Sequence, residues 1–457
     1  MALKKKNRTM IPPFFPVLLF FLGLLRAALA QQNGLTTAEV APEGSAAIEA
    51  SRPVIRNVVR LADVGGSGAE KFVVRSRPEY DIDGSTAYGM PDIKVQSSAG
   101  IKVNDLNAFV PHWRHYTQYA PGQRKYSFMY RAKVLEIPKA YAYTFRDDFI
   151  IADQENVYNV GGCGEKMEGW TLTEEPEGKT LWEAPSQAVL GFHRFRSLAV
   201  LVHKFSNAYF HWITEAMPRL MLYLDVLDEE QKNSMRYLVH NSHFARESLR
   251  LFGVHEFRQA VFYDPSAVYQ AETMYVAAGT PCGNAPKSVL ESLQKRLHYI
   301  LFPKKPYPSL PAPAGDGAAA VPGVVVLVKR NSSRQMENFD EVVETIRSGL
   351  KTNQQLVLFD DSRKYSLISQ YMMFNKAEMI IGAHGGGLTN IVWGNKNTKV
   401  IEILPVTSAA SGRRARVCYA SIAGSLGMDY TMIPVETPSF DSPIQVPVKD
   451  LSKGMRL

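Results

Sequence analysis

Two stretches of the chain alternate short apolar runs with segments whose apolar residues have helical spacing. In the first stretch, residues 198–202 and 235–239 have the pattern of strands, and residues 209–227 between them have the pattern of a helix. Residues 246–252 form a short helical pattern that ends at Gly253. Alternating strands and helices are typical of βαβ units, so we expect a largely parallel sheet.

The second stretch, after residue 322, repeats this alternation. The whole pattern therefore predicts an α/β fold with two Rossmann-like domains that face each other across a cleft, where ligands commonly bind. A helix over residues 286–299 precedes the second stretch and could pack against either domain. The strands predicted in this stretch are 324–328, 355–359, 378–381 and 400–404, and the helices are 340–350, 365–375 and the segment from Leu388 onward.

The first 30 residues have the features of a targeting segment. A basic start precedes the apolar residues 11–25, and Ala28-Leu-Ala30 matches a cleavage site of small residues. The apolar core is short for a membrane span, so we expect a cleaved signal peptide, with an uncleaved signal-anchor as the alternative. Either one places the protein in the lumen of the secretory pathway, in the Golgi or the endoplasmic reticulum. The anchor would make it a single-pass type II membrane protein.

Composition separates the remaining segments. Residues 31–75 are rich in Ala, Gly, Ser, Glu and Gln, which predicts a flexible stem. Residues 303–322 are rich in Pro and Ala and predict a linker or long loop. The expected domains are therefore an N-terminal domain, residues 76–302, and a C-terminal domain, residues 323–457.

Charge and cysteine content narrow the possible partners. The formal net charge is +8 without a long Lys/Arg block, so we expect no nucleic-acid partner. A mildly basic surface suits an anionic substrate equally well. The three cysteines, Cys163, Cys282 and Cys418, allow at most one intramolecular disulfide and leave one thiol over.

The glycine turn after the third strand of the second stretch is the clearest candidate site. An apolar run leads into His384, followed by Gly385, Gly386, Gly387 and the start of a helix. Free backbone N–H groups and the positive end of a helix dipole at such a turn suit a phosphate or diphosphate. The alternative is a tight strand-to-helix turn with a packed histidine.

Charged residues follow two other strands of the second stretch. Arg330 and Arg334 come just after residues 324–328, and arginine side chains bind phosphate oxygens in bidentate fashion. A diphosphate held in this way would need no metal. The alternative is that both are solvated loop charges. Glu402 lies in an apolar strand and needs a partner, either the ribose hydroxyls of a nucleotide or a basic side chain.

The first stretch offers an acid–base pair. His211 and Glu215 are four residues apart in a predicted helix and share one face. Glu215 could orient His211 as a general base, or either residue could take a proton directly from an acceptor hydroxyl. The alternative is a structural hydrogen-bonded pair. Asp81-Ile-Asp83 resembles a metal-binding Asp-x-Asp, but we favour no metal site, and Asp360 and Asp361 are expected to be turn and cap residues.

The combination of residues 209–220, Arg330-Asn-Ser-Ser-Arg334 and Gly382–Asn390 followed by Glu402-Ile-Leu-Pro405 resembles the family 61 glycosyltransferases. The resemblance implies a GT-B fold, an inverting mechanism, a UDP-sugar donor and no essential metal or other cofactor. It places the acceptor and the base at His211 and Glu215. It makes the C-terminal domain the nucleotide-sugar-binding one and the N-terminal domain the acceptor side. Donor and diphosphate binding would involve Arg330, Arg334, His384, Gly385, Gly386, Gly387, Asn390 and Glu402.

The predicted function is therefore transfer of xylose, arabinose or N-acetylglucosamine from a UDP-sugar to a glycan or glycoprotein hydroxyl. The alternative is a non-catalytic glycan-binding protein that has kept the glycosyltransferase fold. A phosphatase or nucleotide hydrolase is disfavoured, because no nucleophile or metal-ligand cluster accompanies the glycine turn.

Overall fold

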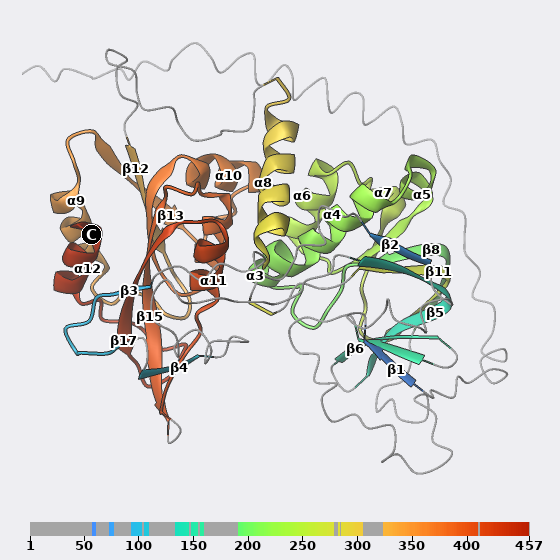
Figure 1. Ribbon diagram of the computed structural model, residues 1–457, viewed down its shortest axis with the longest axis horizontal. Coiled ribbons are helices and arrows are strands. Elements are labelled where there is room, and N and C mark those ends of the chain that lie inside the picture. The colour runs from blue at the N-terminus through green and yellow to red at the C-terminus, as the bar shows by residue number, and fades with distance from the viewer. Residues whose placement is uncertain are drawn as a thin grey trace, which may run out of the picture. The chain divides into compact units, whose positions relative to one another are not determined.

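Two β-sheets with their helices organise the described part of the chain (Figure 1). Both belong to one compact unit that starts at Arg52. The computed structural model describes residues 57–60, 73–76, 93–102, 105–108, 133–145, 148–153, 156–159, 191–277, 282–283, 285–304, 323–409 and 412–456. The predicted leader, stem and Pro/Ala-rich segment lie almost entirely outside these residues, as do Asp81 and Asp83.

The second sheet is a parallel, doubly wound sheet. Its main strands lie in the order β13-β12-β14-β15-β17-β3, and each of these neighbours pairs in parallel. Counted along the C-terminal half of the chain, the order is 2-1-3-4-5, and its switch point lies between β12 and β14. The strands are β12 (Gly323–Lys329), β13 (Gln354–Asp360), β14 (Ala377–Ala383), β15 (Lys399–Ala409), β16 (Gly412–Ala415), β17 (Asp429–Glu436), β3 (Lys94–Val95) and β4 (Leu106–Ala108).

The first sheet is mixed rather than largely parallel. Strands β11, β8, β9 and β10 are parallel neighbours, as the βαβ pattern predicts. Beyond β11, however, β5 pairs antiparallel with β11, β2 and β6, and β6 pairs antiparallel with β7. The strands are β1 (Asn57–Arg60), β2 (Val73–Ser76), β5 (Lys133–Phe145), β6 (Asp148–Ala152), β7 (Asn156–Asn159), β8 (Gly191–Val200), β9 (Arg236–Val239), β10 (Ala260–Phe262) and β11 (Ala267–Ala277).

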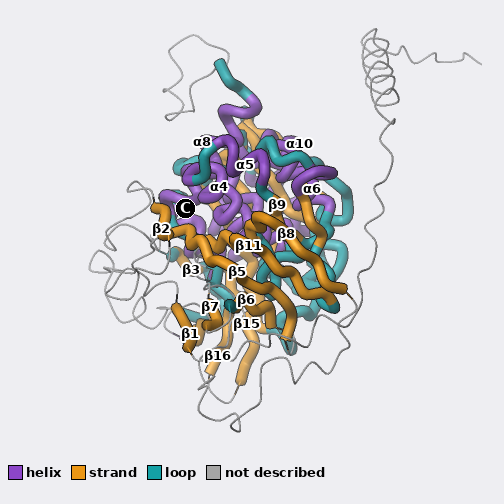
Figure 2. The backbone as a smooth tube through the Cα atoms, turned by 90° about the vertical axis from the view of Figure 1, so that its right-hand side faces the viewer, coloured by secondary structure: helices purple, strands orange, loops and turns teal. Residues whose placement is uncertain are grey.

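Helices pack on both faces of the second sheet. Helices α9 and α12 lie on one side of it, and α10 and α11 lie on the other (Figure 1). Helices α4, α5 and α6 lie on one side of strands β8, β11 and β5 of the first sheet, above them in both views (Figure 1 and Figure 2). The helices are α3 (Tyr209–His211), α4 (Met217–Val226), α5 (Glu229–Ser234), α6 (His243–Leu251), α7 (Glu256–Gln259), α8 (Lys287–Leu301), α9 (Phe339–Gly349), α10 (Leu367–Asn375), α11 (Cys418–Ser425) and α12 (Val448–Arg456).

Two predicted helices differ from the regular α-helix. The long helix predicted over residues 209–227 contains a π-helical segment, η7 (Trp212–Ala216), between α3 and α4. Such segments are rare and are frequent at functional sites. The helix expected from Leu388 onward is a 3₁₀-helix, η8, which begins two residues earlier (Gly386–Trp393). The other predicted elements of the two stretches form with shifts of a few residues at their ends.

Helix α8 contacts elements that accompany both sheets. The Gln294 amide donates to the carbonyls of Val392 and Gly394 at 2.6 and 2.9 Å, while Arg296 pairs with Asp225 of α4. A continuous apolar core also contains side chains from both halves. Helix α8 therefore packs against both halves of the protein, so both of the packing arrangements that the sequence allowed are present. Core members from the first half include Leu220, Tyr237 and Leu249, and those from the second include Val326, Trp393 and Tyr430.

Short N-terminal strands extend the second sheet. Strand β3 pairs with β17, and β4 pairs with β16. The sequence-based division assigns both strands to the first domain, residues 76–302, whereas their hydrogen bonds join them to the second. The parallel sheet leaves an edge at β17, and β3 satisfies its backbone groups.

Cysteine pairing and membrane spans were also open questions from the sequence. Cys282 is disulfide-bonded and Cys418 is a free thiol, which agrees with one bridge and one leftover cysteine. Among the described residues, none of the helices has the length and apolar character to cross a bilayer. The predicted leader at residues 1–30 lies outside them.

Candidate functional site

The first part of the site lies at the carboxyl ends of β12 and β14, the switch point of the second sheet. Arg330 follows β12, and His384 follows β14, where its backbone N–H continues the ladder to Ile403 at 3.0 Å. Ligands of open α/β sheets bind at this kind of position. The strand ends thus bring together two residues that are 54 positions apart in the sequence.

His384 forms a buried pair with Glu402 of β15. The His384 Nδ1 atom lies 2.6 Å from Oε1 of Glu402, and the other carboxylate oxygen accepts a hydrogen bond from Tyr430 of β17. The Glu402 side chain is fully buried, whereas 7% of the His384 side chain is exposed. Of the two partners predicted for Glu402, a basic side chain is present, and it is His384 rather than Arg or Lys.

The glycine turn packs directly against Arg330. Gly385 has φ +151°, a conformation that L side chains rarely adopt, and a Cβ atom there would collide with the Arg330 guanidinium. A Cβ atom on Gly387 would lie 2.8 Å from Cγ1 of Val328, so this glycine allows η8 to approach β12. A Cβ atom on Gly386 would meet nothing within 4 Å. The three glycines therefore have three different roles, and only Gly386 borders open space.

Arg330 packs against this turn, and Arg334 lies near enough to Arg330 for the two charges to interact. The Arg330 guanidinium donates to Ser333 and lies 3.6 Å from Asp361. Arg334 has a left-handed backbone, φ +59°, and its guanidinium pairs with Asp441 at 3.1 Å. Burial and the charge of Arg330 lower the pKa of Arg334, which Asp441 partly offsets. Two like charges at one turn favour an anion between or beside them.

Asn390 has its polar atoms bound within the protein. Its carbonyl oxygen accepts from Tyr209 at 2.8 Å and from the Trp393 indole at 3.1 Å, and its amide donates to the Gly387 carbonyl at 3.1 Å. The side chain is fully buried. Asn390 thus fixes the start of η8 and ties it to α3.

The second part of the site lies at α3 and η7. The Nδ1 atom of His211 lies 2.8 Å from Oε1 of Glu215, as the spacing of four residues predicts. The Glu215 side chain is 1% exposed and that of His211 is 21% exposed. The imidazole is therefore the member of this pair that a dissolved substrate can reach.

The sequence patterns did not indicate several residues around His211. His203, in the loop after β8, lies with Nε2 3.5 Å from Oε2 of Glu215, and burial followed by the charge of Arg219 lowers its pKa well below the ordinary value. Phe205 packs at a tilt against His211 with ring centroids 5.3 Å apart, although 40% of this large apolar residue is exposed. Neither has a local spacing signal, because both lie in the loop after β8.

Aromatic rings connect the two parts of the site. Phe210 contacts His211 at a centroid distance of 5.1 Å and Tyr419 of α11 at 5.5 Å. Tyr419 in turn contacts His384 at 5.0 Å, and its hydroxyl donates to the Gly385 carbonyl at 2.5 Å. The acid–base pair of the first half and the glycine turn of the second half are therefore separated by only two aromatic rings.

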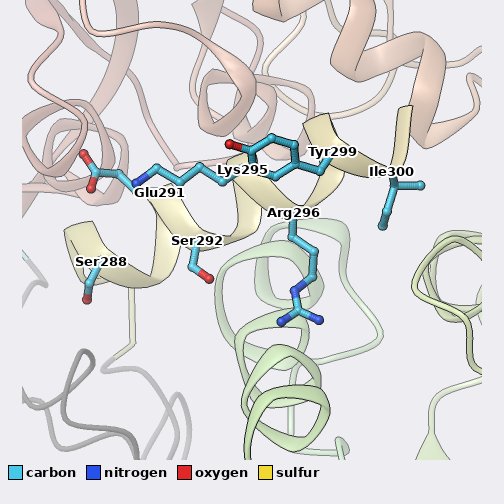
Figure 3. Close-up of a pocket in the computed structure, with 7 residues that line it drawn as sticks. All are labelled: Ser288, Glu291, Ser292, Lys295, Arg296, Tyr299 and Ile300. Carbon is cyan, nitrogen blue, oxygen red and sulfur yellow. The ribbon is translucent and has the colours of Figure 1, made fainter. Parts of the chain in front are cut away.

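Other features of the described residues do not form part of this site. Asp360 accepts hydrogen bonds from Ser362 and Asn331, which agrees with the predicted turn role. Among the described residues, no group of three or more His, Cys, Asp or Glu side chains is arranged to hold a metal ion. A surface pocket of about 640 Å³ lies along one face of α8 (Figure 3). Its described lining is Ser288, Glu291, Ser292, Lys295, Arg296, Tyr299 and Ile300, and none of these is a candidate residue.

The fold defines an α/β protein with a Rossmann-like parallel sheet and a candidate anion site at its switch point. The family model described as Glycosyltransferase 61 matches residues 209–401. The chain is thus similar to this family over a range that begins with α3 and ends inside β15, as its motifs predict, and the similarity implies a glycosyltransferase. The match contains every candidate residue except Glu402, which directly follows it. The comparison with curated proteins finds no match.

Proposed function

We propose that this protein is an inverting glycosyltransferase that transfers a sugar from a UDP-sugar to a hydroxyl of a glycan or glycoprotein. The observation that supports this function best is the proximity of a His–Glu pair to a glycine turn flanked by arginines. The first supplies a base and the second supplies an anion site. Transfer from a sugar nucleotide requires the base and the anion site to lie no farther apart than the length of one donor molecule.

The donor diphosphate would occupy the glycine turn. In this proposal Arg330 and Arg334 supply the positive charge, and the Gly386 and Gly387 amides at the start of η8 supply backbone donors. The open space beside Gly386 supports a close approach of the phosphate oxygens. Because guanidinium groups remain protonated, this site would hold the diphosphate without a metal.

The acceptor would bind at His211. We assign His211 as the general base because it is the exposed member of its pair, and Glu215 as the group that orients it and stabilises its protonated form. His203 behind Glu215 is buried and neutral, so it does not offset the charge of the carboxylate. Glu215 can therefore stabilise the His211 imidazolium that forms. Phe205 would present an apolar ring face to the acceptor beside the base.

The chemical step balances as follows. The acceptor oxygen loses its proton to Nε2 of His211 and forms a bond to the anomeric carbon, while the bond from that carbon to the diphosphate oxygen breaks on the opposite face. The configuration inverts, and the leaving UDP takes the electron pair. Arg330, Arg334 and His384 stabilise the charge that grows on the diphosphate.

The wider setting of this proposal follows the sequence predictions. The two halves would form a GT-B arrangement with the substrates in the cleft between them. The leader at residues 1–30 would deliver the protein to the lumen of the endoplasmic reticulum or Golgi, either as a cleaved signal peptide or as a type II anchor. Loop contacts would select among UDP-xylose, UDP-arabinose and UDP-N-acetylglucosamine.

Calorimetry with UDP on the purified chain, with and without EDTA, tests this function. Micromolar binding that EDTA does not change is the expected result, followed by release of UDP in the presence of one member of a UDP-sugar panel and an acceptor. A protein that binds glycans but neither UDP nor any UDP-sugar would instead be a non-catalytic glycan-binding protein. Binding that disappears with EDTA would contradict the metal-free diphosphate site.

A further inference from the structure

We propose that Glu402 and Tyr430 are positioning residues that hold His384 against the donor diphosphate, and that Glu402 does not bind the ribose. This inference deepens the proposed function and rests on it. The sequence alone permits the opposite assignment, because acidic residues of dinucleotide-binding folds commonly accept ribose hydroxyls.

The contacts of Glu402 argue against a ligand role. Its side chain has no exposed surface, and its two carboxylate oxygens are each engaged, one by His384 and the other by Tyr430. A ribose hydroxyl would have to displace one of these buried groups and leave it without a hydrogen-bond partner, which is unfavourable. An exposed hydrogen-bonding group could bind the ribose hydroxyls without leaving a buried group unsatisfied.

The strand register explains why these three side chains meet. Glu402 pairs with Gly382 of β14, and His384 lies two residues beyond Gly382 on the same face. Tyr430 of β17 pairs with Val400, which lies two residues before Glu402 on that face. His384, Glu402 and Tyr430 therefore form a diagonal line across three parallel strands. Such a line is rigid because each member belongs to a regular strand or continues its ladder.

The diagonal fixes the orientation of the imidazole. A carboxylate only accepts hydrogen bonds, so the hydrogen on His384 Nδ1 points at Glu402. Tyr419 packs against the same ring, and its hydroxyl binds the Gly385 carbonyl. Nε2 has no hydrogen-bond partner among the described residues, so it remains available to an anion.

Nucleotide dissection distinguishes the two assignments. We expect Glu402→Gln in the full chain to weaken UDP binding about tenfold and to leave uridine binding unchanged, because only UDP contains the diphosphate. The 2′-deoxy and 3′-deoxy forms of UDP should lose the same factor as UDP. In a His384→Ala background, Glu402→Gln should cause no further loss. An equal loss for uridine and UDP, or a loss that vanishes with either deoxy form, would overturn the positioning role.

Two further variants and one spectroscopic measurement separate positioning from folding. Tyr430→Phe removes one hydroxyl and should weaken UDP binding severalfold. Glu436→Gln, at the exposed end of β17, is the matched control for Glu402→Gln and should leave UDP binding unchanged. In ¹⁵N-histidine spectra the His384 ring should show a protonated Nδ1, and this signature should change in Glu402→Gln. An unchanged ring signature would contradict the inference without any nucleotide. A wild-type chain that gives this signature but binds no UDP would contradict the proposed function instead.

Discussion

The two His–Glu pairs of this protein have similar geometry but different environments. In the first half, His211 and Glu215 are 2.8 Å apart on one helical segment, and in the second half His384 and Glu402 are 2.6 Å apart on neighbouring strands. In each pair the glutamate is the more buried member, but 21% of the His211 side chain is exposed and only 7% of the His384 side chain. The paired unit alone therefore does not determine the chemistry of either histidine.

The surroundings distinguish the pairs. Aromatic rings and the buried His203 flank His211. These neighbours are uncharged, so the imidazole can accept a proton. His384 instead adjoins the glycine turn against which Arg330 packs. This position suits stabilisation of an anion rather than general-base catalysis. The comparison predicts that variants of the first pair slow the chemical step and leave donor binding unchanged, whereas variants of the second weaken binding of the donor.

Removal of the proposed base should have the largest effect. We expect His211→Ala to lower kcat by about 1,000-fold, because general-base catalysis contributes roughly 10² to 10⁴-fold. The dissociation constant of UDP should stay within a factor of two, and the exposed His255→Ala variant should keep full activity. Steady-state kinetics with calorimetry would decide this, and a large loss of UDP affinity in His211→Ala would remove the proposed difference between the pairs.

Loss of one donor-side arginine should come next. Arg334→Ala should weaken UDP binding and lower kcat/KM by about 100-fold, since hydrogen bonds to charged groups contribute roughly 1.5–3 kcal/mol. The matched control is Arg363→Ala, whose guanidinium is mostly exposed and pairs with Asp360. Full activity of a folded Arg334→Ala protein would count strongly against a diphosphate at this turn.

A pair of glycine variants sharpens the position of the ligand. A Cβ atom on Gly386 meets no protein atom, so Gly386→Ala should leave the thermal unfolding midpoint unchanged yet weaken UDP binding about tenfold by crowding the ligand. Gly385→Ala should also lower the unfolding midpoint, because its Cβ atom collides with Arg330 and its backbone becomes strained. Equal UDP affinity for Gly386→Ala and wild type would place the diphosphate elsewhere.

The smallest effect concerns stability at low pH. Burial lowers the pKa of His203 in the folded state, so below the ordinary value of 6.5 the unfolded chain binds a proton that the folded protein does not. The free energy of unfolding should therefore fall as the pH decreases from about 6.5, by up to about 1.4 kcal/mol per pH unit for this one group. Denaturant titrations at several pH values should show a shallower decrease for His203→Gln than for His255→Gln. Parallel slopes for the two variants would contradict it.

Local features of the site could be predicted, whereas its cross-strand partners could not. The helical spacing correctly paired His211 with Glu215, and the apolar run with three glycines correctly located a turn at the end of a strand. The roles of individual glycines and the partners of Asn390 were not accessible, because they depend on Arg330, Val328 and Tyr209, which are distant in the sequence. His203 and Tyr419 were missed for the same reason.

The sequence by itself determined the alternation of strands and helices, the similarity to a glycosyltransferase family and the existence of a His–Glu pair within one helix. The alternation and the pair follow from periodicities of two to four residues, which act within a single element, and the similarity follows from the motifs and their order along the chain. Only the tertiary structure decided that Glu402 faces His384 and Tyr430. It also decided that β5 pairs antiparallel with β11 in the first sheet and that β3 joins the second sheet. These depend on strand order and register, and hydrogen bonding between distant segments sets them.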